Sequence, residues 1–186
     1  MEYIDICDES GSPTGEIIDR ETAHRDGILH RTAHVWIVRK KTQGYDILLQ
    51  KRSMEKDSFP GLYDTSSAGH IPTGSEPLPS AIRELKEELG IAAKPEQLIY
   101  AGSFRIQYEE VFHDQVFKDN EITKAYVYQE PEARGLGTLI PARGWKPSHP
   151  TLLLSTRNMI VGLGNMIPVR GRKDRLCVYL QGRLFY

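Results

Sequence analysis

Three carboxylates stand close together between Arg83 and Ile91, where the chain reads RELKEELGI. Glu84, Glu87 and Glu88 are spaced i, i+3 and i+4, and on an α-helix these positions share one face. Like charges one turn apart repel each other, and a divalent cation among them removes that cost. Because Mg²⁺ takes oxygen ligands from carboxylates and substrate phosphates, the spacing predicts a helix that holds Mg²⁺ against a phosphorylated substrate. The alternative is a solvated acidic helix face with no metal.

The neighbouring residues predict the helix that positions these carboxylates. Proline at positions 77 and 79 suits a first helical turn, where a missing N–H costs little. Gly90 then suits a left-handed C-terminal cap. We therefore expect a helix over about 77–89 whose carboxylates lie mostly off its apolar stripe, which consists of Leu78, Ile82, Leu85 and Leu89.

The segment from Gly69 to Ile91 resembles the Nudix box. That pattern is a glycine, five residues, Glu, seven residues, Arg-Glu, an aliphatic residue, any residue, Glu-Glu, any residue, Gly and an aliphatic residue. One position departs from it, because Ser75 stands where the pattern has its first Glu and Glu76 is its neighbour. The departure puts fine positioning in question more than metal binding. The matching residues are Gly69, Arg83, Glu84, Leu85, Glu87, Glu88, Gly90 and Ile91.

Residues 1 to 129 resemble the branch of Nudix proteins that also contains isopentenyl-diphosphate isomerase, with stretches such as HRDGILHR, LLQKRS and FPGLYDTSSAGH. The isomerases carry a catalytic cysteine shortly before the Gly-His pair. This chain has Ser66 and Ser67 there, and its cysteines, Cys7 and Cys177, lie elsewhere. A hydroxyl is a far weaker acid than a thiol, so isomerase chemistry is disfavoured and phosphoanhydride hydrolysis is the function left.

The resemblance implies a first set of site residues. Glu84, Glu87 and Glu88 are the metal ligands, joined by the Gly69 carbonyl. Arg83, which stays protonated and can hold a carboxylate, orients them. Glu121 is the candidate base that activates the attacking water, with a turn residue as the alternative. The pair Lys51 and Arg52 contacts phosphate, or else forms a solvated strand end.

The resemblance also implies a second metal site. In the isomerases, histidines near the positions of His24, His30 and His70 bind a softer metal, and carboxylates match Asp119 and Glu121. Imidazole suits Zn²⁺ or Mn²⁺ better than Mg²⁺. The alternative is that these histidines are ordinary packed or surface residues.

The rest of the pattern indicates an α+β fold. Residues 3–7 alternate, and residues 16–18 can return as their partner. Residues 34–38 and 45–49 predict a hairpin, and residues 98–104 and 122–128 predict further strands around a polar excursion at 107–120. This fits the Nudix fold, an α/β/α sandwich with a mixed β-sheet.

Composition limits the class of protein. The chain has 186 residues, 39% hydrophobic residues and 26% charged residues, which suits one globular domain. A net charge of −1 gives no case for nucleic-acid binding, and no apolar run reaches the length of a membrane span. The N-terminus lacks the features of a secretory signal, and the two cysteines suit reduced thiols, so we expect a cytoplasmic protein. A homodimer is compatible with these features.

The last third of the chain departs from the family pattern. Residues 131–186 hold nine Lys or Arg and two acidic residues, a net charge of +7, whereas residues 1–130 carry −8. We therefore divide the chain into a Nudix domain over 1–130 and an atypical basic C-terminal segment over 131–186. That segment is either a basic appendage for a polyanion or a frame-shifted, poorly folded sequence, and the second is favoured. Leu152–Leu154 and Met159–Leu163 are its candidate helical pieces.

Together these features predict a Mg²⁺- or Mn²⁺-dependent Nudix pyrophosphohydrolase. Its substrate is a small molecule with a diphosphate linkage, a nucleoside diphosphate linked to a group X or a related diphosphate. Two alternatives stay open, an isoprenoid-diphosphate isomerase-like activity and a non-catalytic Nudix-fold binding or regulatory protein.

Overall fold

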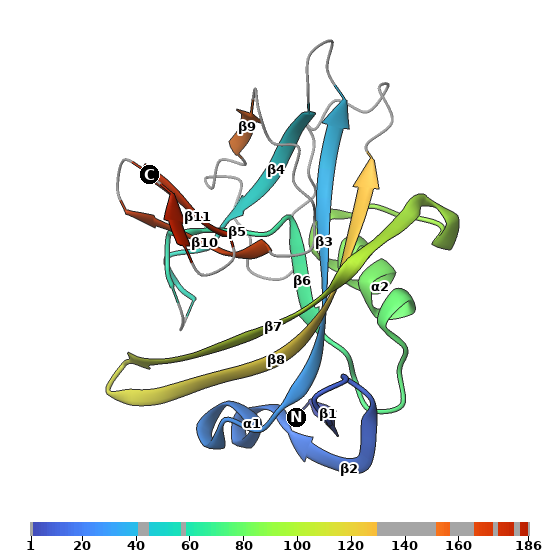
Figure 1. The fold of residues 1–186 in the computed structure, drawn as a ribbon, viewed down its shortest axis with the longest axis vertical. Helices are drawn as coiled ribbons and strands as arrows, with labels where there is room; N and C mark the ends of the chain where they lie inside the picture. Colours follow the sequence, from blue (N-terminus) through green and yellow to red (C-terminus); the bar gives the residue numbers. More distant parts are fainter. Residues whose placement is uncertain are drawn as a thin grey trace.

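The computed structural model describes residues 2–40, 45–56, 59–129, 152–156, 166–172, 175–180 and 183–185. A long central strand, β3 (His30–Lys40), runs through the molecule, as Figure 1 shows. It pairs antiparallel with β4 (Tyr45–Lys51) and β6 (Ser67–His70), and parallel with β8 (Gln115–Gln129). The short strand β5 (Tyr63–Asp64) extends the sheet from β4. The sheet is therefore mixed, and the predicted α+β Nudix fold is confirmed.

The N-terminal hairpin also follows the prediction. β1 (Tyr3–Cys7) pairs antiparallel with β2 (Pro13–Asp19), with Ile4 opposite Ile18. The helix that follows, α1 (Arg20–Asp26), was not predicted, because its seven residues carry no apolar stripe. Its ends are nevertheless defined, since the Asp19 side chain accepts from the Thr22 N–H and Gly27 takes a left-handed φ of 72°.

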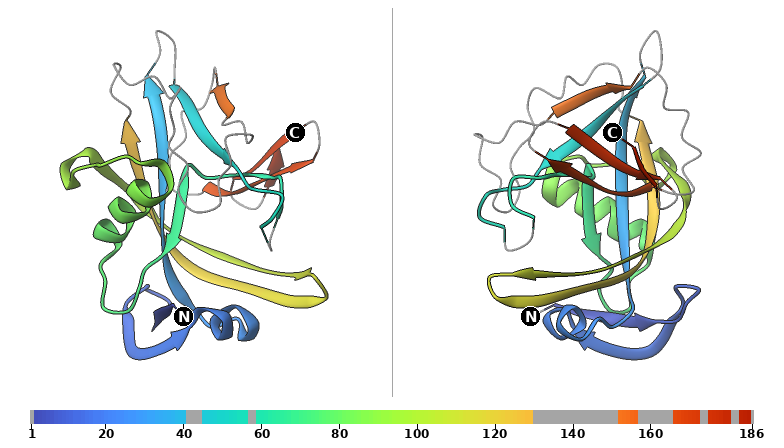
Figure 2. Two further views of the ribbon diagram at one scale, coloured as in Figure 1. Left: turned by 180° about the vertical axis from the view of Figure 1, so that it is seen from behind. Right: turned by 60° about the vertical axis from the view of Figure 1, so that its left-hand side comes forward.

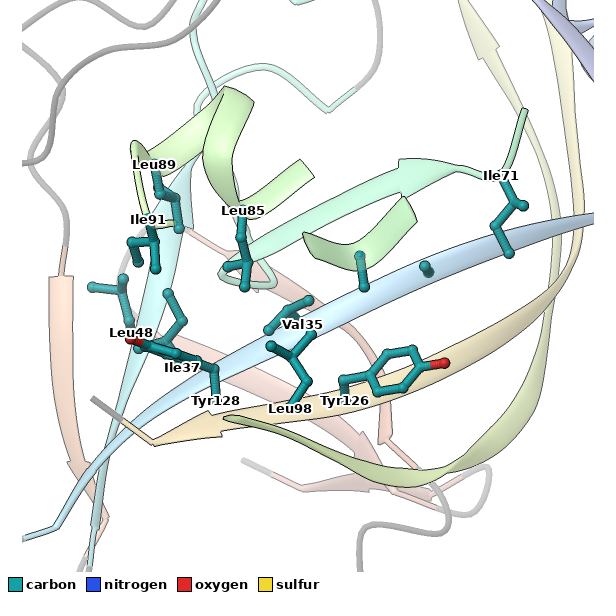
Figure 3. Close-up of a cluster of buried hydrophobic side chains, with 12 residues drawn as sticks. Val35, Ile37, Leu48, Ile71, Leu85, Leu89, Ile91, Leu98, Tyr126 and Tyr128 are labelled. Atoms are coloured by element: carbon teal, nitrogen blue, oxygen red, sulfur yellow. The ribbon is translucent and has the colours of Figure 1, made fainter. Parts of the chain in front are cut away.

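The box helix forms as expected. α2 spans Pro77–Leu89, and Gly90 ends it with a φ of 68°. Alternate residues of β3 face this helix and build the core with it, as Figure 3 shows for Val35, Ile37 and Leu85. A 3₁₀ turn, η1 (Pro95–Gln97), then leads into β7. The core cluster comprises Ala33, Val35, Ile37, Leu48, Ile71, Ala81, Leu85, Leu89, Ile91, Leu98, Tyr126 and Tyr128.

The expected polar excursion at 107–120 is wrong. β7 (Leu98–Phe112) and β8 form one antiparallel hairpin that pairs as far as Phe112 and Gln115. His113 and Asp114 turn the chain with φ angles of 50° and 60°, the positive values that a two-residue hairpin turn requires. The turn was missed because neither residue is glycine. The far end of the hairpin projects from the sheet in Figures 1 and 2.

Toward the C-terminus the described residues are strands. β9 (Leu152–Thr156) pairs antiparallel with β4, so the helical piece expected at Leu152–Leu154 is wrong. The pairing sets Leu152, Leu153 and Leu154 opposite the apolar residues Leu49, Leu48 and Ile47 of β4, a cross-strand contact that a short isolated helix would not make. β10 (Met166–Arg172), β11 (Arg175–Leu180) and β12 (Arg183–Phe185) form a separate three-stranded sheet. The expected piece at Met159–Leu163 lies outside the described residues.

None of the helices in the described residues is long and apolar enough to cross a membrane. The division at residue 130 stays a prediction, because most of the chain between 130 and 165 lies outside the described residues.

Candidate functional site

The α2 carboxylates lie against the short strand β6. Arg83 donates to Glu84 Oε1 at 2.6 Å and to the His70 carbonyl oxygen at 3.2 Å, so one guanidinium joins the helix to the strand. A Cβ placed on Gly69 would overlap the carboxyl group of Glu84. The box glycine is therefore required by space, because Glu84 occupies the volume that any side chain at 69 would need.

The fold changes the acidity of Glu88, another carboxylate of α2. The Ala68 N–H lies 3.4 Å from Glu88 Oε2, which places this carboxylate beside the backbone just before Gly69. Burial raises the pKa of Glu88 to about 7, and the nearby charge of Glu84 adds to the rise. A divalent cation would offset this repulsion, so the group fits the predicted oxygen ligand set.

Three histidines meet on the opposite face of the sheet. His24 Nε2 and His70 Nε2 are 3.0 Å apart, and the His30 and His70 rings stack with centroids 5.2 Å apart. His30 Nδ1 donates to the Ile28 carbonyl at 2.8 Å, so Nε2 is the ring nitrogen that faces Glu121. Burial lowers the pKa of His24 to about 4 and that of His70 to about 3. Imidazole nitrogens gathered in this way are suited to a Zn²⁺- or Mn²⁺-like ion.

Two buried carboxylates from β8 complete this cluster. Glu121 Oε1 lies 3.7 Å from His30 Nε2, and Asp119 Oδ1 lies 3.7 Å from His24 Nδ1. Burial and the charge of Glu121 raise the pKa of Asp119 to about 9. Burial opposes ionisation of Glu121 as well, but the neighbouring His30 and His70 outweigh it and lower the pKa of Glu121. The two buried carboxyls therefore interact strongly and titrate as a pair.

Unsatisfied atoms in this cluster indicate a missing ligand. His24 Nδ1, His30 Nε2 and Asp119 Oδ1 are buried and have no hydrogen-bond partner among the described residues. Buried polar atoms are rarely left unpaired, and an ion is one accepted explanation. The ligand atoms of His24, His30 and His70 lie within 4.8 Å of one another, as do those of His30, Asp119 and Glu121. The donor set therefore fits a Zn²⁺- or Mn²⁺-like cation.

β6 links the two groups of ligands. Successive residues of a strand point to opposite faces, so Gly69 faces α2 and His70 faces the other histidines. In the same way β3 directs Ala33 and Val35 to the core, and His30 and Thr32 to the histidine cluster. The α2 carboxylates and the histidine cluster thus lie on opposite faces of the sheet, on either side of β6.

The other predicted site residues are Arg52, Lys51 and Glu121. Arg52 donates to Asp64 Oδ2 at 2.8 Å, so its guanidinium is held to β5. A phosphate contact of Arg52 stays a prediction. Lys51 belongs to β4, but its side chain lies outside the described residues. Glu121, expected just before a strand, lies within β8.

Both serines near the Gly-His pair are buried, and the hydroxyl of Ser66 is bonded within the sheet. Ser66 is fully buried, donates to the Leu48 carbonyl at 2.6 Å and accepts from the Ile37 N–H at 2.8 Å. Ser67 is fully buried as well. Cys7 lies in β1, where burial raises the pKa of its thiol.

Aromatic residues beside the histidine cluster were not predicted as site residues. Phe117 stacks on His24 with centroids 4.3 Å apart. Phe59 takes a left-handed φ of 46° and packs against Tyr108 and Phe112, with centroids 5.5 and 4.9 Å apart. The Tyr108 phenol bonds to Asp119, and burial raises the pKa of that phenol above its ordinary value. Sequence alone gives no signal for this cluster, because the polar residues between these rings suggested a loop.

Comparison with known proteins agrees with the fold and the box. A family model described as the NUDIX domain matches residues 28–145. Nudix hydrolase 3 of Arabidopsis thaliana is 44% identical over 126 residues, which are 68% of this chain and 16% of that protein. An uncharacterized Nudix hydrolase of Clostridium acetobutylicum is 36% identical over 142 residues, which are 73% of this chain and 68% of that protein.

Two further likenesses concern the branch and the fold. An isopentenyl-diphosphate Delta-isomerase of Pectobacterium atrosepticum is 37% identical over 86 residues, 46% of each chain. A crystal structure from Deinococcus radiodurans has a TM-score of 0.56 at 19% identity and covers 83% of each chain, which supports the fold alone. The chain spans only about a sixth of the Arabidopsis protein's length. With the family model matching more than half of the chain, this protein belongs to the Nudix domain family.

Proposed function

We propose that this protein hydrolyses a diphosphate linkage, in a nucleoside diphosphate linked to a group X or in a related diphosphate, with a divalent cation. The observation that carries the proposal is the α2 carboxylate group, which Arg83 and Gly69 fix against β6. Phosphoanhydride hydrolysis needs neutralised phosphate charge and a positioned water. Glu84, Glu87 and Glu88 could supply both by holding a divalent cation, and the raised pKa of Glu88 shows that this group of carboxylates is costly to ionise without one.

The ligands divide between two proposed sites. Glu84, Glu87, Glu88 and the Gly69 carbonyl are proposed to hold Mg²⁺ or Mn²⁺. His24, His30, His70, Asp119 and Glu121 are proposed to hold a softer ion. When bound, such cations neutralise phosphate oxygens and lower the pKa of bound water.

The chain's own residues supply positioning and proton transfer. Glu88 is an alternative candidate for the base, because it lies among the proposed ligands and a bound cation would keep its carboxylate ionised and able to accept a proton. Glu121, first considered as that base, has a lowered pKa, which suits a ligand that must stay ionised. Arg83 keeps Glu84 in place rather than taking part in proton transfer.

The group X is proposed to lie against the aromatic residues next to His24. Half-buried rings from Phe59, Tyr108, Phe112 and Phe117 offer apolar and aromatic contact area beside the proposed second site. A flat or apolar X gains from such contacts, whereas a charged X does not. This supports a nucleoside or a similar group over a further phosphate.

A substrate screen tests the proposal directly. Diphosphates that differ in X are incubated with Mg²⁺ or Mn²⁺, and released phosphate and product masses are measured. We expect cleavage between the two phosphorus atoms for at least one substrate, and none without a divalent cation. If the metal-loaded protein binds diphosphates without cleaving any, the non-catalytic binding alternative is correct.

The second candidate, isomerisation of isopentenyl diphosphate, rests on the likeness to the isomerases over 46% of the chain. Ser66 and Ser67 are both buried, and Ser66 has both of its bonds within the sheet. We therefore expect no dimethylallyl diphosphate above a no-enzyme control, and its detection would favour the isomerase instead.

A further inference from the structure

We propose that Thr32 is a positioning residue that fixes the Glu121 carboxylate for the histidine metal site. Thr32 lies on β3 two residues after His30, and Glu121 lies opposite His30 in the parallel β3–β8 ladder. The Thr32 hydroxyl donates to Glu121 Oε2 at 2.9 Å. The other carboxylate oxygen, Oε1, is the one that faces His30 Nε2. The single bond from Thr32 thus assigns one oxygen to the scaffold and leaves the other for the cation.

A second threonine, Thr123, extends the bond between Thr32 and Glu121 into a chain. Thr123 lies opposite Thr32 in the same ladder, and the two hydroxyl oxygens are 2.9 Å apart. A hydroxyl has one hydrogen, and Thr32 gives its hydrogen to the carboxylate, so Thr123 donates to Thr32. The chain of bonds runs from Thr123 through Thr32 to Glu121. Polarisation along such a chain strengthens the terminal bond to the charged group.

Burial makes the arrangement rigid. Thr32 is 2% exposed, Thr123 is 0% exposed and Glu121 is 6% exposed. Bulk water therefore does not compete for the carboxylate oxygen that Thr32 holds. A β-branched side chain in a strand also has few χ1 states, so the donor hydroxyl stays in place. The carboxylate cannot rotate away from His30 without losing a buried, charge-assisted bond.

This role parallels that of the Ile28 carbonyl, which accepts from His30 Nδ1 and so fixes the His30 ring. Outer partners of this kind orient metal ligands, and their loss typically weakens metal binding about 10- to 100-fold. The inference rests on the proposed second metal site, but it does not depend on hydrolysis.

The test is a titration of the metal-free protein with Co²⁺, followed by visible absorption. The signal that disappears in His70→Asn reports the histidine site, separately from the α2 carboxylates. Thr32→Val keeps the shape and removes the donor, and we expect the Co²⁺ dissociation constant to rise about 10- to 100-fold. Thr32→Ser restores the hydroxyl and should bind within a few-fold of the unmodified protein. Thr123→Val removes only the outer bond and should fall between the two.

Unchanged affinity in Thr32→Val overturns the proposal, and so does Thr32→Ser binding as weakly as Thr32→Val, since the effect is then one of packing. Should Thr32→Val not fold, Thr32→Ala removes the same donor with a smaller side chain and is judged in the same way. Absence of any His70-dependent signal in the unmodified protein removes the second metal site and this inference together. Diphosphate hydrolysis that persists in that case leaves the proposed function standing.

Discussion

The two groups of candidate ligands differ in how the chain brings them together. Glu84, Glu87 and Glu88 lie within five residues on α2, whereas the histidine cluster joins residues from 24 to 121. A helix fixes the first group locally through its 3.6-residue period. The second group exists only because α1, β3, β6 and β8 meet. Local spacing therefore identifies a helical ligand set, while a sheet-based set depends on pairing that no local pattern contains.

The largest effect is expected at the helical group. Glu87→Gln and Glu88→Gln should each reduce turnover at least about 100-fold, because each keeps the side-chain shape and loses the charge that acts in the transition state. Lys86→Gln, an exposed residue on the same helix, is the matched control and should change turnover little. Near-normal rates in both glutamate variants at saturating Mg²⁺ would show that α2 does not hold the catalytic metal.

The histidine group should show a separable effect on metal binding. His30→Asn should weaken binding of Mn²⁺ or Co²⁺ to this site by at least about 100-fold, since it removes a ligand and not merely its outer partner. His113→Asn, at the exposed hairpin turn, is the control and should bind normally. Equal binding in both variants would mean that the three histidines form a packed cluster without a metal.

Gly69→Ala tests the contact that joins the helix to the strand. The added Cβ overlaps Glu84, so we expect a loss of about 1–3 kcal/mol in the free energy of unfolding, measured with urea. Glu84→Ala removes the obstructing group. Adding Gly69→Ala to a Glu84→Ala protein should therefore cost much less, and an equal cost in both backgrounds would disprove the steric explanation.

The raised pKa of Glu88 predicts a pH effect on the metal-free protein. The folded carboxyl has a pKa of about 7 against an ordinary value of 4.5, so the folded state binds the proton more tightly than the unfolded state. Its contribution to stability is complete below pH 4.5 and is lost as the pH rises through 7. As the pH rises from about 4.5 through 7, the Tm of the unmodified protein should fall by several degrees relative to the Tm of Glu88→Gln.

Saturating Mg²⁺ should remove most of that shift, because the cation stabilises the ionised carboxylate. A Tm difference that is independent of pH in the metal-free protein would show that Glu88 is not the group that titrates.

The smallest effect concerns the C-terminal segment. Residues 131–186 carry +7 against −8 in the remainder, so apart from the pairing of β9 with β4 we predict loose, salt-screened attachment and first proteolytic cuts between Arg134 and Arg157. Structure in this segment then adds little to the stability of residues 1–130. Amide exchange as slow in the segment as in β3 would show instead that it is part of the folded core. RNA binding that disappears with the segment would favour the basic appendage.

The elements that could be predicted from sequence are those that local rules control. α2, its proline start, its glycine cap, the β1–β2 pair and the β3–β4 hairpin were all predicted, because period, capping and turn chemistry act within a few residues. The carboxylates Glu84, Glu87 and Glu88 were identified by spacing for the same reason, whereas Gly69 and Arg83 were identified through the resemblance to the Nudix box. The histidines, by contrast, were proposed only through a resemblance, since nothing in their spacing predicts that they meet.

The tertiary structure sets which side-chain atoms face each other. It placed Gly69 under Glu84, brought the His24 and His70 nitrogens within 3.0 Å of each other and aligned Thr32 with Glu121. It also turned the expected excursion into the β7–β8 hairpin, whose parallel pairing with β3 carries Asp119 and Glu121 to the histidines. Parallel pairing joins residues some 90 positions apart, and its register depends on the whole core rather than on any local signal.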